Sequence, residues 1–326
     1  MNKPPYNPFE PLNFREDICF LSGEPLVERL MVPVFPEWLI SRYQLAETSI
    51  AMLAGNRMKY SEMVLPASKK VVAAIEALDK LTEKAFTEGF EAVMALPEQT
   101  LFQWMARIMY GVVYQDFSYA ITKFQEKDRE FNISPLMQRK MKNLHLMLQS
   151  LIHPVVFDDF CPWSIARFPV NYSKDIFNYK DETHKLNFCL GMNGFGFIAC
   201  LQDNGVVRRF YQDDLTKIGR QTLHPAQLEE LYGRFMYANY LLRESPDYEL
   251  EEQAETLVLH LPGDAPKNDE FAPWDEKVYA QVLANMWQPW GIEMRHIYVP
   301  PNSPISFVID EFTNAFIPAE KVNLPN

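Results

Sequence analysis

Two apolar runs, each introduced by a proline, constrain the fold of this chain more than any other feature. Behind Pro97, apolar side chains recur every three or four residues on two faces of one helix, which predicts a helix buried all round. Ser134 and Pro135 supply a cap and a first-turn proline, and the apolar repeat after them predicts a second helix that ends before Pro154. The sequence therefore predicts a central helical hairpin over residues 96–152.

From Trp163 onward, the apolar residues alternate instead of following the helical repeat. Asn204 and Gly205 lie between two β-rich runs, and this pair favours the type I′ turn of a hairpin. We therefore expect a three-stranded antiparallel meander over 186–211. Further strands are expected at 256–261, 292–299 and 305–310, and further helices at 67–94, 223–242 and 275–288. The expected fold class is α+β, with a C-terminal antiparallel sheet and flanking helices.

The size and composition of the chain are those of a globular protein. Its 326 residues suffice for about two domains, and 48% of them are hydrophobic and 23% charged. No apolar run reaches the length of a membrane span, and the N-terminal residues lack a signal-peptide pattern. Cys19, Cys161, Cys189 and Cys200 have neither disulfide-scaffold nor metal-knuckle spacing. We expect a cytoplasmic protein without membrane contact, in which the last three cysteines are small core residues.

Charge is concentrated in one segment. The formal net charge is -12, and residues 244–276 carry eleven acidic residues against the single Lys267. A strongly acidic surface repels a phosphate backbone, which argues against nucleic acid as a partner. The basic cluster over 123–142 is interrupted by acidic residues and is interpreted as a solvated helical surface.

The N-terminal region has the outline of a metal-binding motif. Cys19, two residues, Ser22 and Gly23 begin it, and Val32-Pro33 stands before Val34-Phe35-Pro36-Glu37-Trp38-Leu39. Pro66 then opens a helical run that carries Ile75-Glu76. This layout resembles the zinc-bound treble-clef domains of HNH-type endonuclease-like proteins. The domain organisation expected from it is a degenerate HNH-like region at 1–95, the helical hairpin at 96–152 and an α+β region at 153–326.

The resemblance implies that the chemistry of such a site has been lost. It puts the zinc-ligand positions at Cys19, Ser22, Ser68 and Val71, and the acid-histidine pair of the catalytic strand at Val32 and Pro33. A structural zinc needs four thiolate or imidazole ligands, and HNH-type catalysis needs a histidine to activate water. We therefore expect no zinc cofactor and no nuclease activity. Phe35, Trp38, Val71 and Val72 are expected to be buried and to hold the region together by apolar packing.

Two other residue groups are candidates for a site. Arg107, Tyr110, Tyr114 and Asp116 recur along one helix at a spacing that could line a groove, beside Gly111, which would allow close approach to the backbone; they could equally be core residues. His153, Asp158, Asp159 and His184 could form a metal site, or could cap and bracket turns. The tryptophans Trp104, Trp163, Trp274, Trp287 and Trp290 are interpreted as packing residues.

Three functions are compatible with these patterns. The first is a non-catalytic protein, a pseudoenzyme of bacterial origin, that binds a protein or other macromolecular partner and needs no cofactor. The second is a metal-dependent hydrolase whose site lies in the C-terminal α+β region. The third is a nucleic-acid binder that does not cleave, against which the acidic balance argues. Fold resemblance alone identifies neither ligand nor partner.

Overall fold

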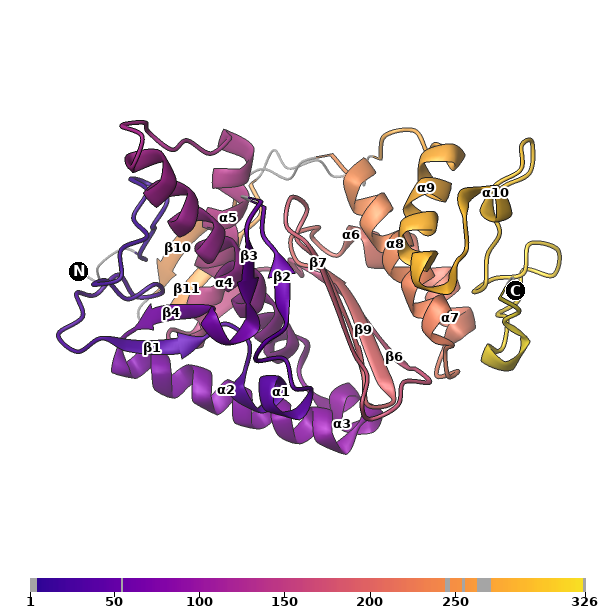
Figure 1. Cartoon of the computed structure of the whole chain (residues 1–326), viewed down its shortest axis with the longest axis horizontal. Helices are drawn as coiled ribbons and strands as arrows, with labels where there is room; N and C mark the ends of the chain where they lie inside the picture. Colours follow the sequence, from indigo (N-terminus) through magenta and orange to yellow (C-terminus); the bar gives the residue numbers. More distant parts are fainter. Residues whose placement is uncertain (1–4, 54, 244–246, 254–255, 263–270, 325–326) are drawn as a thin grey trace. The chain divides into compact units, whose positions relative to one another are not determined.

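The computed structural model describes residues 5–53, 55–243, 247–253, 256–262 and 271–324 (Figure 1). It has the α+β class that the sequence predicts, with helices and several small sheets. No helix in these ranges is long and apolar enough to cross a membrane. The acidic segment 244–276 lies partly outside the described residues.

The chain forms two compact units, and each is made of separate stretches of sequence. Unit 1 comprises residues 1–85, 96–159 and 247–262, and unit 2 comprises residues 86–95, 160–246 and 263–326. The expected ranges 1–95, 96–152 and 153–326 are consecutive, so they do not coincide with these units. The chain leaves and re-enters each unit, and hydrophobic periodicity gives no signal for such a crossing.

Unit 1 combines short strand pairs with long helices. Strands β1 and β4 pair antiparallel, as do β2 and β3, and β11 lies between β10 and the parallel β5. Its elements are β1 (Leu30–Pro33), α1 (Glu37–Arg42), β2 (Ser49–Ala51), β3 (Arg57–Lys59), the 3-10 turn η1 (Tyr60–Glu62), β4 (Val64–Ala67), most of α2 (Lys69–Glu88), α4 (Glu98–Gln125), α5 (Pro135–Leu148), η2 (Gln149–Leu151), β5 (Val155–Phe157), β10 (Glu249–Gln253) and β11 (Thr256–His260).

Helices α4 and α5 confirm the expected pair, and their bounds follow the predicted signals. Pro97 is the N-cap of α4, and the Ser134 side chain accepts a hydrogen bond from the backbone N–H of Met137 at the start of α5. Almost every residue of α4 from Leu101 to Phe117 is buried, as its two apolar faces predict. Helix α4 is therefore the core helix of unit 1.

The proline-rich N-terminal arm packs onto this core. Phe9 and Phe14 are buried, with ring contacts to Tyr110 and Tyr114 of α4 respectively. The arm over residues 5–15 therefore packs on α4 of unit 1.

Unit 2 is built on a four-stranded antiparallel sheet in the order β6-β9-β8-β7. Helix α8 covers one of its faces (Figure 1). The elements of unit 2 are the end of α2, α3 (Phe90–Ala95), β6 (Ser164–Pro169), β7 (Phe177–Glu182), β8 (Asn187–Met192), β9 (Phe195–Cys200), α6 (Val206–Phe210), α7 (Gln212–Ile218), α8 (Pro225–Leu241), α9 (Glu276–Trp287), η3 (Gln288–Trp290), α10 (Met294–Ile297) and η4 (Ala319–Lys321).

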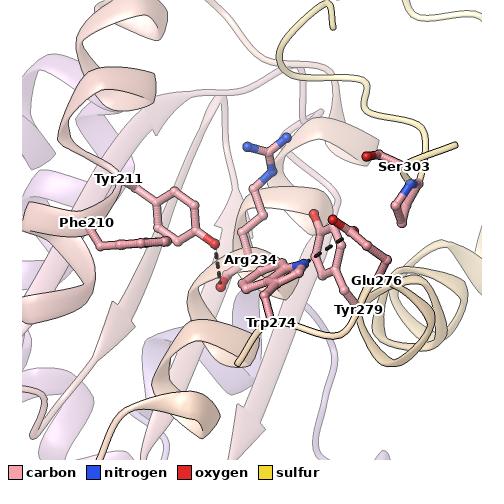
Figure 2. A pocket seen from close by; sticks show the side chains of 8 residues that line it. Phe210, Tyr211, Arg234, Trp274, Glu276, Tyr279 and Ser303 are labelled. Carbon is pink, nitrogen blue, oxygen red and sulfur yellow. Dashed lines mark hydrogen bonds between the residues drawn. The ribbon is translucent and has the colours of Figure 1, made fainter. Parts of the chain in front are cut away.

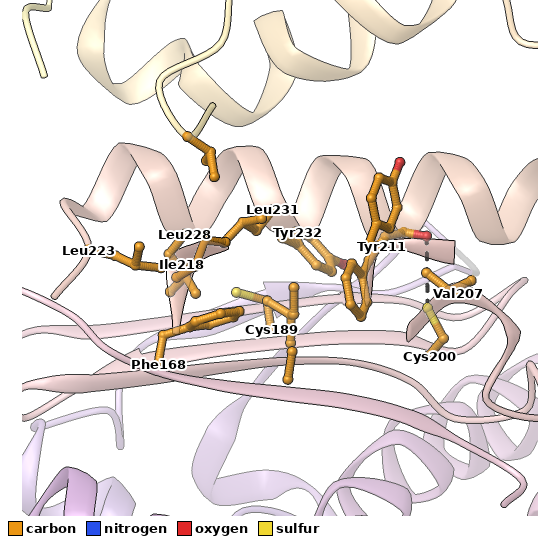
Figure 3. Packing of buried hydrophobic residues seen from close by; sticks show 14 of the residues in the cluster. Phe168, Cys189, Cys200, Val207, Tyr211, Ile218, Leu223, Leu228, Leu231 and Tyr232 are labelled. Carbon is orange, nitrogen blue, oxygen red and sulfur yellow. Dashed lines mark hydrogen bonds between the residues drawn. The ribbon is translucent and has the colours of Figure 1, made fainter. Parts of the chain in front are cut away.

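The central strands of this sheet are buried on both faces. Figure 3 shows Cys189 and Phe168 beneath Leu228, Leu231 and Tyr232 of α8. On the other face, the phenylalanines of β8 and β9 pack on one another and on Phe86. A strand buried on both faces reads as a near-continuous apolar run, which is the pattern of FGFIAC in β9.

The cysteines and the helix over 67–94 follow the sequence predictions only in part. All four cysteines are free; Cys189 and Cys200 are buried as expected, whereas Cys161 is exposed, so its assignment to the core was wrong. The expected helix over 67–94 is divided into α2 and α3 at Gly89, which has φ 96°. A positive φ ends a right-handed helix, and glycine adopts it without steric cost.

The predicted turn at Asn204-Gly205 is wrong as a hairpin. Both residues have positive φ, but helix α6 follows them instead of a third strand. The reason is Asp203, whose carboxylate accepts the backbone N–H groups of Gly205 and Val207 and so caps the helix start. The hairpin turn of the sheet is formed by Asn193 and Gly194, which also have positive φ, between β8 and β9.

The strands expected at 292–299 and 305–310 are also absent from the described residues. The first segment contains α10 instead. In the second, side chains satisfy the backbone donors: the Glu230 carboxylate accepts the N–H of Phe307 at 2.6 Å, and Ser306 Oγ accepts those of Val308 and Ile309. A β-rich sequence does not need a sheet when side chains supply its hydrogen bonds. The helices expected at 223–242 and 275–288 and the strand at 256–261 are confirmed.

Candidate functional site

The loop over residues 17–26 forms a compact turn at the start of unit 1. The backbone N–H of Cys19 donates to Glu24 O at 2.9 Å, that of Gly23 to Cys19 O at 3.0 Å, and that of Leu26 to Asp17 O at 2.8 Å. Gly23 has φ 67°, and a Cβ at this position would lie 2.3 Å from the Tyr6 ring. The turn therefore requires glycine both for its backbone conformation and for the close approach of Tyr6.

Hydrogen bonds join this turn to the strand pair and the helix that follow. The N–H of Phe20 donates to Pro66 O in β4 at 2.8 Å, and Val32 of β1 pairs with Leu65 of β4. Ser68 comes directly after β4 and accepts the N–H of Val72 in the first turn of α2. A tight turn, a strand pair and a helix start are thus held together by main-chain bonds.

The side chains at the motif positions are packed and poor in metal donors. Cys19 and Val71 have no exposed area and Val32 is 3% exposed. The Ser22 hydroxyl donates to the Glu24 carboxylate, and the buried Ser68 Oγ has no hydrogen-bond partner within the described part of the chain. Of the residues expected to be buried, Phe35 and Val71 are, while Trp38 and Val72 are half-buried. One thiol among serine and valine does not form a zinc ligand set.

A buried ion pair lies next to Pro33 at the end of β1. Arg107 of α4 has no exposed area, and its guanidinium donates to the Pro33 carbonyl at 3.1 Å and to the Asp79 carboxylate of α2 at 2.9 Å. Burial raises the pKa of Asp79 to about 6, against the opposing effect of the Arg107 charge. The guanidinium thus connects β1, α2 and α4 through its two terminal nitrogens, while its Nε is buried and has no hydrogen-bond partner among the described residues.

The other members of the candidate groove are core residues. Tyr110, Tyr114 and Asp116 are at most 4% exposed. Tyr110 stacks on Phe20 and contacts the His145 ring at a centroid distance of 5.2 Å. Gly111 does allow a close approach, and the group that approaches is the Val34 side chain, 2.6 Å from where a Cβ would be. These residues therefore pack α4 against the rest of unit 1.

His145 is a fully buried titratable group in this packing. Its Nε2 lies 2.9 Å from the Phe20 carbonyl, and its Nδ1 lies 3.5 Å from Gln149 Nε2. Burial lowers the pKa of His145 to about 4, although hydrogen bonding to backbone groups favours the charged form. His145 is therefore neutral at pH 7, with Nε2–H donating to Phe20.

The four residues of the alternative metal site are divided between the units. His153, Asp158 and Asp159 belong to unit 1, and His184 belongs to unit 2. Asp158 accepts from His260 at 2.8 Å, and His184 interacts with Glu182 at 3.1 Å. Within the described ranges, no group of three or more histidine, cysteine or acidic side chains is arranged to hold a metal ion.

Unit 2 contains a pocket that the sequence patterns do not predict. It has a volume of about 300 Å³ and is lined by Phe210, Tyr211, Arg234, Trp274, Glu276, Tyr279, Ser303 and Pro304 (Figure 2). Tyr211 and Tyr279 are buried, whereas Phe210 and Trp274 are 53% and 37% exposed. Trp274, interpreted from the sequence as a packing residue, is thus a partly exposed wall of a pocket. The sequence signal for its exposure is its position just before Asp275, the N-cap of α9, because a residue that precedes a helix lies outside the helix.

Arg234 is held at one side of this pocket by acidic groups. Its guanidinium donates to Glu230 at 2.7 Å, to Asp214 at 2.9 Å and to Ser306 Oγ at 3.0 Å. Burial alone lowers the pKa of Arg234, but the Glu230 and Asp214 carboxylates beside it outweigh this effect and raise it. Arg234 is therefore a permanently charged wall residue whose charge is already compensated.

Comparisons with known proteins give no assignment for either region. No family model matches the chain, and neither a curated protein nor a solved structure matches it significantly.

Proposed function

We propose that this chain is a non-catalytic binding protein whose unit 1 descends from an HNH-like treble clef that has lost its zinc ligands and its catalytic residues. In this proposal it is a cytoplasmic bacterial pseudoenzyme, and its partner is a protein or another macromolecule. The observation that carries the proposal is that Cys19, Val32 and Val71 are buried and packed at the positions where a metal site would need donors and access.

The arrangement of main-chain bonds supports this descent. The 17–26 turn bonds to β4, β1 pairs with β4, and α2 begins immediately afterwards. This order of a turn, a strand pair and a helix is that of the resemblance, and here it is stabilised by backbone pairing and apolar side chains. A frame that no longer depends on metal for its stability can keep its fold after the ligands are lost.

The chemistry of the residues disfavours hydrolysis at this place. Hydrolytic nuclease chemistry needs a general base and a metal or other cation directed at phosphate. Val32 and Pro33 have no titratable side chain, and the Arg107 guanidinium is fully buried and bonded to Asp79 and Pro33. A phosphate would have to displace these bonds and open the core.

Metal content and the Cys19→Ser variant test the proposal together. We expect far less than one zinc per chain by mass spectrometry of untagged protein purified without chelator. We also expect an unchanged melting temperature when a zinc chelator is added. Cys19→Ser should change the free energy of unfolding by about 1 kcal/mol or less, as a small buried substitution does.

The matched control is Cys161→Ser, because Cys161 is the exposed cysteine. Near-stoichiometric zinc that Cys19→Ser releases and Cys161→Ser retains would contradict the proposal. Retention of DNA that weakens steeply with salt would favour the non-cleaving nucleic-acid binder instead.

A further inference from the structure

We propose that the pocket of unit 2 binds an organic cation, an alkylammonium or guanidinium group carried on a short alkyl or aromatic body. All residues that line the pocket belong to unit 2. This inference is therefore independent of the proposed loss of zinc ligands in unit 1.

The aromatic walls provide the first part of the argument. The Trp274 ring packs against Tyr237 at 4.5 Å and Tyr279 at 4.9 Å between centroids, and 37% of its residue area is still exposed. Figure 2 shows Phe210 and Tyr211 on one side of the pocket and Trp274 and Tyr279 on the other. Aromatic faces attract cations through their quadrupole, and tryptophan does so most strongly.

The charges around the pocket provide the second part. Glu276, the first residue of α9, contributes a carboxylate to the lining, and the Trp274 indole N–H donates to it at 3.3 Å. This neutral donor orients the carboxylate and leaves its negative charge in place. The Arg234 charge is compensated by Glu230 and by Asp214, which Lys217 also contacts at 3.5 Å. With Glu276 included, carboxylates outnumber cationic side chains in this group, and an excess of negative charge favours a cation over an anion.

The Tyr279 hydroxyl provides the third part. Tyr279 is 7% exposed, and Arg234 interacts with its hydroxyl. Burial raises the pKa of Tyr279 well above its ordinary value, against the effect of Arg234, so the hydroxyl stays protonated. A phenol oxygen can accept more than one hydrogen bond, so it can also accept an N–H from a bound ammonium or guanidinium group.

The size of the pocket limits the ligand. A volume of about 300 Å³ is at the small end of ligand sites and admits one cationic head with a short chain or one ring. A free amine and a lysine or arginine side chain of a polypeptide share this chemistry, and the experiment below separates them.

Titration calorimetry on the full chain with phenethylammonium, its neutral isostere phenethyl alcohol and the anion phenylacetate tests the proposal. We expect the ammonium to bind at least about tenfold more tightly than either of the other two. Glu276→Gln should weaken ammonium binding about tenfold, and Trp274→Ala should abolish it. Glu320→Gln, an exposed acidic residue of the same unit outside the pocket, is the matched control and should bind like the wild type.

A second arm identifies the source of the cation. Acetyl-Gly-Lys-Gly-amide is compared with its norleucine analogue, which lacks the charge. Binding of the lysine peptide about tenfold more tightly than phenethylammonium would assign the ligand to a polypeptide side chain, and weaker binding would assign it to a free amine.

Three results would overturn the proposal. They are equal binding of ammonium and neutral isostere, ammonium binding that Glu276→Gln leaves unchanged in folded protein, and no heat from any cation up to ~10 mM, beyond the range of a specific fragment site. Folding of each variant is checked by circular dichroism and its melting temperature. Glu276 is only partly buried, so Glu276→Gln keeps the test informative even if Trp274→Ala unfolds.

Discussion

Helix α4 of unit 1 and helix α8 of unit 2 share several sequence features, but their arginines have different surroundings. Each begins at a proline, is buried along most of its length, and carries an arginine and a glycine in its middle. In α4, Arg107 is closed within the core and Val34 fills the space beside Gly111. In α8, Arg234 keeps part of its side chain at the edge of a pocket.

The difference lies in the number of acidic partners. Arg107 bonds to one carboxylate and to a backbone carbonyl, so it serves to join three elements of unit 1. Arg234 bonds to two carboxylates and a serine, and a third carboxylate, Glu276, stands in the same pocket. Arg107, with one carboxylate partner, joins elements of the core, whereas Arg234 lies beside a pocket that holds an additional carboxylate.

The largest effect should come from Arg107→Met. This change leaves the Asp79 carboxylate, which is only 17% exposed, without its cation. We expect a loss of about 3–5 kcal/mol in the free energy of unfolding, measured in urea. Adding Asp79→Asn should recover part of the loss because it removes the stranded charge. A loss below about 1 kcal/mol for the single variant, as at an ordinary surface site, would show that Arg107 does not hold unit 1 together.

The next effect is a dependence on pH from His145. Its folded-state pKa of about 4 lies below the ordinary value of 6.5, so its contribution is complete above pH 6.5 and is lost as the pH falls toward 4. A shift of this size corresponds to about 3 kcal/mol. The free energy by which wild type exceeds His145→Gln should shrink by about that amount between pH 7 and pH 4.

The quantity to measure is the difference in free energy of unfolding between wild type and His145→Gln at each pH. This difference is needed because the buried carboxyl groups change the stability of both proteins with pH in the opposite direction. Burial raises the pKa values of Asp79 and Asp203 to about 6, so both add stability as the pH falls below 6. A constant gap between wild type and His145→Gln would show that His145 titrates normally.

The smallest effects should have opposite signs in the two helices. In α4, a Cβ on Gly111 would lie 2.6 Å from Val34 Cγ2, so Gly111→Ala should cost about 1–3 kcal/mol through overpacking. In α8, a Cβ on Gly233 would lie 3.4 Å from Val282 and 3.5 Å from Leu283, which is ordinary contact. Gly233→Ala should therefore gain about 0.5–1 kcal/mol from helix propensity. Thermal melts of both variants check the prediction, and a stabilising Gly111→Ala would mean that α4 is more loosely packed.

Much of the fold could be predicted because its signals are local. The proline starts and apolar repeats of α4, α5 and α8 are properties of a few turns of helix, and each helix lies where its repeat predicts. The strands at 206–211, 292–299 and 305–310 were mispredicted because Asp203, Glu230 and Ser306 satisfy backbone donors there. When a side chain accepts the hydrogen bonds that a neighbouring strand would otherwise accept, the sequence of the segment itself does not show it.

The site could be predicted only in part. The motif positions in unit 1 come from consecutive sequence, so Cys19, Ser22, Val32 and Pro33 could be identified by spacing alone, as could the poverty of metal donors among them. The pocket of unit 2 combines Phe210, Arg234, Trp274 and Tyr279 from separate elements. The sequence around Trp274 does not distinguish a buried tryptophan from one that is partly exposed in a pocket.

The sequence by itself determined the α+β class, the long helices and the chemical character of the motif positions, because propensity, periodicity and side-chain chemistry are carried by neighbouring residues. Only the tertiary structure decided that Arg107 is enclosed while Arg234 borders a pocket, and that Tyr279 is buried beside Arg234 in that pocket. Burial and hydrogen-bond partners depend on residues far away in the chain, and they exist only after the chain has packed.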